Sequence, residues 1–207
     1  MVSLWSLASL GQIVLSNVGG APPKANSPTN VLYTATFNHT ISGAVSFFSE
    51  NGSAIVDVNI TNLPESGGPF MYHVHEKPVP SNGDCLATLG HFNPYNGSMS
   101  APSAASKEVG DLSGKHGLIN GTSVHTRYID PFLSLNPNDD AYFGHLSVVV
   151  HYKNSTRIAC ANITRETSVV PGDFEDDVAA RWSVAGTAWF KSVWGFLGIF
   201  VSSTPQE

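Results

Sequence analysis

Short runs of β-branched and aromatic residues, separated by turn-forming residues, constrain the fold of this chain more than any other feature of its sequence. Such residues favour strands, and Asn51-Gly52 between two of the runs is typical of a tight hairpin turn. The runs are residues 31–37, 43–49, 54–60, 68–77, 145–152 and 156–163. Seven or eight short strands joined by irregular loops predict an all-β fold, an antiparallel Greek-key sandwich or barrel with long loops.

The amino-acid composition agrees with many short strands and excludes one class of partner. The 207 residues fit one domain with tails. The chain contains 19 Gly and 13 Pro to form turns, and only 13% charged residues, which does not favour long helices with charged faces. Its formal net charge is −6 and it has no basic run, so we expect no nucleic-acid partner.

The first twenty residues are apolar and end in small residues, a pattern that resembles a signal peptide. We predict cleavage near Gly20 or Ala21, although Lys and Arg are missing from the start of this segment. An ordinary first strand or a buried helix is the alternative. Residues 21–28, which include three prolines, are expected to form a linker to the folded domain.

Residues 164–207 differ in composition from the rest of the chain and are expected to form a tail. An acidic stretch at 173–177 precedes residues 184–201, which are apolar apart from three residues, among them Lys191. A hydrophobic end after a spacer is typical of a GPI-attachment signal, which would attach the protein to a membrane or cell wall. Lys191 and the polar residues after 201 depart from that pattern. A membrane span, an interfacial helix and a segment packed on the barrel are the alternatives.

Seven Asn-x-Ser/Thr sequons and a low cysteine count indicate an extracellular protein, either secreted or held at the cell surface or cell wall. The sequon means glycosylation only in a secreted chain. The two cysteines, Cys85 and Cys160, are compatible with one disulfide bond, and two buried free thiols are the alternative. The candidate glycosylation sites are Asn38, Asn51, Asn59, Asn96, Asn120, Asn154 and Asn162.

A His-x-His pair inside one predicted strand is the first sign of a metal site. Side chains at i and i+2 of a strand point to the same face, so His73 and His75 present two imidazoles together while Val74 turns to the apolar side. Alone the pair is weak, because a chain with 8 His can contain one by chance.

Two further histidines strengthen the metal hypothesis. His91 lies in a long loop expected over residues 78–112, and loops of this length without periodicity are usually functional or disordered. His151 follows the buried-looking run 148–150, where an imidazole is costly to bury unless it has a partner such as a metal. Ligation by imidazoles alone suits copper or zinc and disfavours calcium or magnesium.

At this point several separated motifs, in one order, resemble the copper/zinc superoxide dismutase family over residues 30–163. They are HVHE (73–76), Cys85, GHFNP (90–94), VGDLSG (109–114), VVVH (148–151) and RIAC (157–160). The resemblance implies an eight-stranded antiparallel Greek-key β-barrel and a dismutase domain at residues 28–163. It implies copper ligands at His73, His75, His91 and His151. It also implies a Cys85–Cys160 disulfide, and a guiding role for Arg157 toward the superoxide anion.

The departures from the family pattern concern zinc. Zinc-binding members carry two further histidines between the positions of His91 and Asp111, whereas the interval here has none and Glu108 stands in it. A structural zinc ion needs about four ligands. The link between His151 and Arg157 is also short, where zinc-binding members have a long charged loop. The chain thus resembles the fungal extracellular copper-only branch, and we predict one copper ion per chain and no zinc.

The function implied by the resemblance is conversion of superoxide to dioxygen and hydrogen peroxide by Cu(II)/Cu(I) cycling. We expect Glu108 to orient His91 and help manage its proton, a solvated loop carboxylate being the alternative. Asp111 is expected to hold the local loop. A non-enzymatic extracellular copper-binding or cell-wall glycoprotein on the same barrel is the competing function. No ligand role is predicted for His39, His116, His125 and His145.

Overall fold

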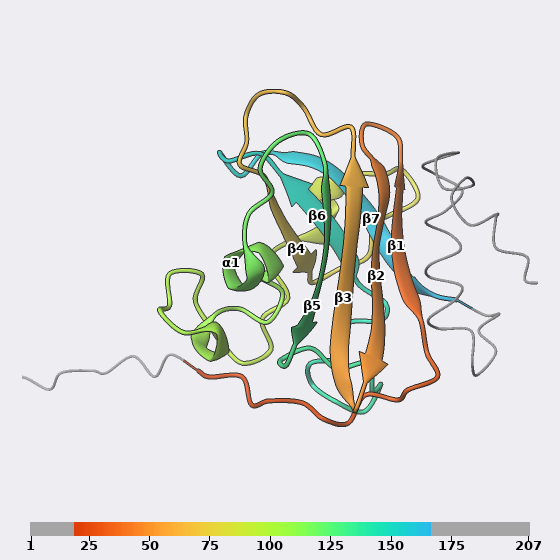
Figure 1. Ribbon diagram of the computed structural model, residues 1–207, viewed down its shortest axis with the longest axis vertical. Helices are drawn as coiled ribbons and strands as arrows, with labels where there is room; N and C mark the ends of the chain where they lie inside the picture. Colours follow the sequence, from red (N-terminus) through yellow and green to blue (C-terminus); the bar gives the residue numbers. More distant parts are fainter. Residues whose placement is uncertain (1–18, 167–207) are drawn as a thin grey trace, which may run out of the picture. The chain divides into compact units, whose positions relative to one another are not determined.

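The computed structural model describes residues 19–166, which form one antiparallel sheet of seven strands curled into a half-barrel (Figure 1). The strands are β1 (Tyr33–Asn38), β2 (Ser42–Glu50), β3 (Ser53–Thr61), β4 (Met71–His75), β5 (Val124–Asp130), β6 (Ser147–His151) and β7 (Arg157–Arg165). Their order in the sheet is β4-β6-β7-β1-β2-β3-β5. The connections from β3 to β4, β4 to β5 and β5 to β6 each link strands from opposite sides of this order, and the one from β4 to β5 is the longest.

The core lies on one face of the sheet because apolar residues alternate along the strands. In β2, Val45 and Phe47 are fully buried, and so are their partners on β3, Val58 and Val56. β6 is buried along its whole length. An apolar strand that ends in a histidine therefore carries that side chain into a dry environment.

The two edge strands, β4 and β5, are bridged by side chains and by a short helix. The hydroxyls of Tyr72 on β4 and Tyr128 on β5 are 3.1 Å apart. Helix α1 (Leu112–His116) packs against β4, and the ammonium of Lys115 lies 2.6 Å from a carboxylate oxygen of Asp130 at the end of β5. Neither of these two charged side chains is exposed. The helix therefore spans the open side of the half-barrel.

The long connection from β4 to β5 holds most of the irregular structure near β4. It contains two 3-10 turns, η1 (Cys85–Thr88) and η2 (Ala104–Ser106), before α1 begins. Its backbone returns to β4 where Val74 donates to Gly110, Gly110 donates to Phe92 and Phe92 donates to Val74. A Cβ on Gly110 would lie 2.3 Å from the carbonyl oxygen of Val74, so only glycine fits this meeting of three backbone segments.

The sequence predicted the all-β class and the antiparallel sheet correctly, but the strand count differs. The described residues form seven strands and not eight. The strand without a predicted counterpart is β5, VHTRYID, whose middle residues are polar and exposed, so it lacks the continuous apolar run that marks the others. Residues 1–18 of the predicted signal peptide and the hydrophobic segment 184–201 lie outside the described residues. In the part of the chain that is described, no helix has the length and hydropathy needed to cross a membrane.

Residues 21–28, expected to be a linker, instead form an extended strap fixed along the lower edge of the domain (red in Figure 1). Ala21 is buried in the hydrophobic core cluster. Ser27 donates from its backbone to Gly52 in the β2–β3 turn, and Leu135 donates from its backbone to the Ser27 hydroxyl. The contacts reach residues far away in the sequence, so local composition gave no sign of them.

Candidate metal centre

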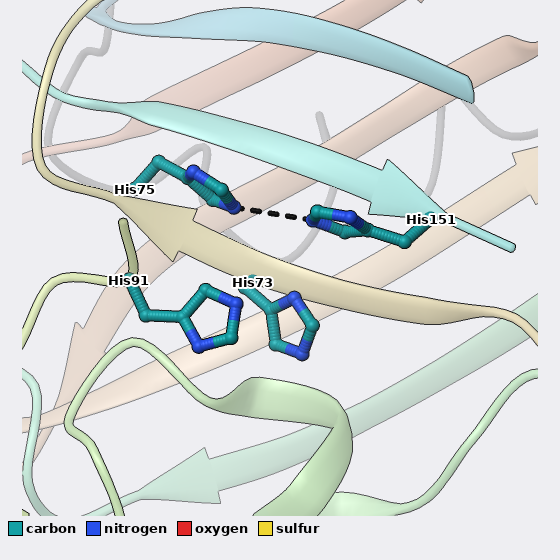
Figure 2. A group of neighbouring side chains, drawn as sticks. All are labelled: His73, His75, His91 and His151. Carbon is teal, nitrogen blue, oxygen red and sulfur yellow. Dashed lines mark hydrogen bonds between the residues drawn. The ribbon is translucent and has the colours of Figure 1, made fainter. Parts of the chain in front are cut away.

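Two neighbouring strands and one loop bring four histidines together (Figure 2). His73 and His75 lie two residues apart on β4 and share a face of the strand. His151 ends the adjacent strand β6, where it pairs with Met71. His91 comes from the loop, held next to β4 by an isolated β-bridge with His75. The structure thus brings together all four histidines that the sequence singled out as ligands.

One nitrogen of each ring faces a common centre. The four candidate ligand atoms lie within 4.8 Å of one another, and Nε2 of His75 lies 3.1 Å from Nε2 of His151. His73, His75 and His151 are buried, and His91 is half-buried. The arrangement is a compact, largely dry cluster of imidazole nitrogens with one ring nearer the solvent.

The outward nitrogens are held by the protein, which fixes the orientation of each ring. Nδ1 of His75 is 3.0 Å from the carbonyl oxygen of Leu89, and Nδ1 of His151 is 3.1 Å from that of Ser155. Nδ1 of His91 lies 2.6 Å from a carboxylate oxygen of Glu108. A ring whose Nδ1–H donates to such an acceptor presents a bare Nε2 to the centre.

His73 is oriented the other way round. Its Nε2 lies 3.2 Å from the hydroxyl of Ser113 and 3.4 Å from a carboxylate oxygen of Asp111, so its Nδ1 faces the cluster. That Nδ1 is buried and has no hydrogen-bond partner among the described residues. A buried polar atom without a partner is costly, and a metal ion would satisfy it. The donor set, four imidazole nitrogens and no carboxylate, fits copper.

Burial lowers the pKa of the three buried imidazoles, because the charged form loses its hydration. The pKa of His75 is lowered to about 3 and that of His151 to about 4, and in both cases neighbouring imidazoles and Arg157 add to the effect of burial. Burial also lowers the pKa of His73, although the nearby carboxylate of Asp111 acts in the opposite direction. These rings are neutral at pH 7, the form that binds a metal.

Asp111 connects α1 to the ring of His73. Its side chain caps the helix by accepting from the backbone N–H of Gly114 at 2.8 Å. Burial alone would raise the pKa of Asp111, but the contacts with His73 and Gly114 hold it below its ordinary value. Asp111 therefore stays ionised beside the ring, at a distance from the ligand nitrogens.

Arg157 begins β7 and reaches back over η1. Its guanidinium donates to the carbonyl oxygens of Cys85 and Leu89, and to the hydroxyl of Thr88 at 3.1 Å. A disulfide joins Cys85 to Cys160, three residues further along the same strand. The cation and the disulfide thus fix the same turn, whose Leu89 carbonyl also orients His75.

Four hydroxyl or carbonyl partners of the rings were not anticipated from the sequence. Thr88, Leu89, Ser113 and Ser155 contact ligand histidines through ordinary side-chain or backbone atoms, and nothing in their sequence context marks them. Ser113 alone offered a hint, because it lies two residues after Asp111. The histidines without a predicted ligand role are indeed outside the cluster, and His116 pairs with Asp130 at 2.9 Å.

Comparison of the sequence with known proteins shows the family to which this chain belongs. Residues 41–163 match the family described as copper/zinc superoxide dismutase (SODC). The cell surface Cu-only superoxide dismutase 5 of Candida albicans is 48% identical over 151 residues, which is 70% of this chain and 66% of that relative. The cell surface superoxide dismutase 4 (Cu-Zn) of the same organism is 43% identical over 182 residues, 86% of this chain and 77% of the relative.

A solved structure gives the same result for the fold. The Cu(II) form of Candida albicans superoxide dismutase 5 is 44% identical, with a TM-score of 0.65. The match covers 70% of this chain and 97% of that structure.

Proposed function

This chain belongs to the copper/zinc superoxide dismutase family, and from that premise we propose how its own residues convert superoxide to dioxygen and hydrogen peroxide at one copper ion. The ion would be held by Nδ1 of His73 and Nε2 of His75, His91 and His151. Bound copper supplies the redox chemistry, taking an electron from one superoxide and giving it to a second. The observation that carries this proposal is the buried, unpartnered Nδ1 of His73 within the cluster of ligand nitrogens.

We propose that Glu108 serves His91, the ligand ring nearest the solvent. The 2.6 Å contact between its carboxylate and Nδ1 fixes the tautomer that leaves Nε2 bare. Both side chains keep some exposure, 15% for His91 and 20% for Glu108, so a proton held at Nδ1 can exchange with water through the carboxylate. Peroxide formation consumes protons, and Glu108 is the group placed to deliver one through this ring.

The remaining charged residues have separate tasks. Asp111 positions His73 from the helix cap and does not face the ligand nitrogens. Arg157 provides a fixed positive charge on a chain whose formal net charge is −6. Since salt screens charges beyond roughly 10 Å, a cation close to the site attracts an anionic substrate more effectively than the distant acidic surface repels it.

We expect the enzyme to work without zinc. Glu108 already holds the outward nitrogen of His91, the ligand atom that a second metal beside copper would need. The interval between His91 and Asp111 offers no histidine or cysteine. Superoxide dismutase 5 of Candida albicans, which is named a Cu-only enzyme, agrees with the lack of zinc ligands in this interval.

We place the enzyme outside the cell, like its cell-surface relatives, and propose that the sequence features at both ends serve export and attachment. Residues 1–20 would be a signal peptide. The tail, expected from residue 164, would begin only after β7 ends at Arg165 and would attach the domain to the membrane or cell wall. Six of the seven sequon asparagines are exposed in the folded domain, and Asn59 is half-buried. These exposed positions leave room for glycans.

Metal analysis combined with a dismutation assay tests the function. The protein, produced in a secreting host and loaded with copper, should contain one copper and no zinc per chain and should remove superoxide. The His73→Ala variant should lose copper and activity together, while His39→Ala, an exposed histidine outside the cluster, should keep both. Stoichiometric zinc would overturn the copper-only assignment, and a copper-loaded protein without activity would favour a copper-binding glycoprotein.

A further inference from the structure

The loop that begins just after His91 and carries Glu108 has few restraints within it. Between Phe92 and Gly110, where the backbone leaves and rejoins β4, its only regular element is the three-residue turn η2. Inside the loop, the side chain of Asn93 bonds to the backbone of Gly97, and Ser98 donates from its backbone to Ser106. These bonds organise the loop itself and do not attach it to the rest of the barrel.

Val109 anchors the end of the loop, because it packs in the core and its carbonyl accepts a hydrogen bond from Lys115. The strap formed by residues 21–28 attaches the two limbs of the loop before that point. On the first limb, the ammonium of Lys24 lies 2.6 Å from the hydroxyl of Tyr95 and 5.0 Å from the centre of its ring. On the second limb, the backbone N–H of Ala21 donates to the carbonyl oxygen of Ala105 at 2.7 Å. Tyr95 comes four residues after His91, and Ala105 comes three residues before Glu108.

The other end of the strap is anchored to parts of the domain that do not belong to the loop. The Lys24 ammonium also lies 2.8 Å from a carboxylate oxygen of Asp139, and the side chains of this pair are only 12% and 7% exposed. The Lys24 backbone donates to Pro131, and the amide of Asn26 donates to Asp139. Lys24 therefore links two loops through a single, largely desolvated charge.

We propose that the strap is a positioning element for the metal centre: Lys24 and Ala21 clasp the two limbs of the 92–110 loop and so hold His91 against Glu108. Only the predicted effect on the copper ion rests on the function proposed above. The clasp itself is a property of the copper-free protein. Lys24 is a positioning residue, and it acts through Tyr95 on the loop and not on the substrate.

Hydrogen exchange in the copper-free protein tests the clasp independently of activity. Lys24→Met keeps the aliphatic stem but removes the ammonium, and Tyr95→Phe removes only the hydroxyl that accepts from it. Both variants should speed the exchange of protected amides in residues 94–107 by about tenfold, the cost of one charge-assisted hydrogen bond, while β2 and β3 stay protected. Ser134→Ala is the matched control, because it removes a bond from the strap to the barrel that does not involve the loop.

A spectroscopic readout tests the consequence for the metal centre. At equal copper content, the electron paramagnetic resonance spectrum of Cu(II) should change in Lys24→Met and Tyr95→Phe, since His91 is a proposed ligand, and should not change in Ser134→Ala. Lys24→Arg, which keeps the charge and the donors, should restore most of the wild-type spectrum.

The outcomes separate the clasp from the dismutase assignment. Unchanged loop exchange in a folded Lys24→Met or Tyr95→Phe protein would overturn the clasp, whatever the activity. Faster exchange over the whole domain would also contradict it, because the strap would then be a general stabiliser. If Lys24→Met fails to fold, Tyr95→Phe decides alone. Faster loop exchange with an unchanged Cu(II) spectrum would show that the strap restrains the loop, but it would contradict the proposal that the strap positions the metal centre.

Discussion

Glu108 combines two properties that different substitutions can separate: it accepts a hydrogen bond from His91, and it carries a charge near the solvent. Glu108→Ala removes both, and we expect its turnover at matched copper content to fall by about 10²-fold, a typical contribution of a positioned acid–base group. Glu108→Gln keeps an acceptor for Nδ1–H, so its Cu(II) spectrum should stay close to wild type while turnover still falls at high pH. Pulse radiolysis over a pH range is the measurement, and wild-type turnover in the Ala variant would remove Glu108 from the mechanism.

Arg157 is the second residue whose charge and hydrogen bonds can be tested apart. Arg157→Ala should lower the rate at low ionic strength by roughly tenfold and flatten its dependence on salt, because a steering charge is lost. Arg157→Lys keeps the charge but cannot reach all three acceptors on η1, so it should retain the salt dependence and lose part of the rate. The comparison is the rate constant against salt concentration. Equal rates for wild type and Arg157→Ala at low salt would exclude steering.

At the scale of elements, the disulfide between Cys85 and Cys160 ties η1 to β7 over 75 residues of chain. A loop of that length is expected to stabilise the fold by about 4 kcal/mol through the unfolded state. The Cys85→Ser/Cys160→Ser double variant should therefore unfold at lower urea concentration by that amount, and it should lose activity because η1 carries the acceptors of Arg157. A loss below about 1 kcal/mol, measured against the oxidised wild type, would show that the turn is held by Arg157 alone.

The contact between α1 and β5 makes stability depend on pH. Burial alone would raise the pKa of Asp130, but its bonds to His116 and Lys115 hold the pKa below its ordinary value. A depressed folded-state pKa contributes stability that is present above the unfolded value and is lost as the pH falls through the folded value. This ion pair therefore stabilises the fold at neutral pH and is lost in acid.

Asp130→Asn should consequently cost about 3–5 kcal/mol at pH 7, the usual penalty for breaking a buried pair. The cost should shrink as the pH falls below 4. Urea unfolding at pH 7 and at about pH 3 measures the difference. Asp140→Asn, an exposed carboxylate, is the control and should show little effect at either pH. An equal penalty for Asp130→Asn at both pH values would refute the linkage.

The elements also show what the sequence can and cannot reveal. β2, β3 and β6 were predictable because each carries a run of residues that only a buried strand face explains. β5 was not, since its middle residues are polar. The His-x-His spacing indicated two candidate ligands because strand geometry places both rings on one face. The contacts of the outward nitrogens of His75 and His151 with the carbonyl oxygens of Leu89 and Ser155 depend on backbone geometry and have no sequence signature. The prediction of a linker at residues 21–28 was wrong for the same reason, because the strap contacts distant parts of the chain, such as Tyr95, which is 71 positions from Lys24.

For the whole molecule, copper itself should be a stabilising ligand. A ligand that binds only the folded state adds about 4 kcal/mol when its free concentration is a thousand times its dissociation constant. Copper-loaded protein should therefore melt well above the copper-free form in calorimetry, and chelation should reverse the shift. His75→Ala should show no such increase, whereas His39→Ala should match wild type. A copper-independent melting temperature in wild type would contradict ligation by the buried cluster.

The place of β7 in the sheet has a consequence for biosynthesis. It is the final strand along the described chain, yet it lies between β1 and β6. The two parts of the sheet therefore cannot be joined until about residue 165 has left the ribosome. Every sequon precedes that point. If the chain is exported as it is translated, each asparagine meets the glycosylating enzyme before the strands can assemble. Asn59, half-buried in the finished sheet, would be open to modification only in that interval.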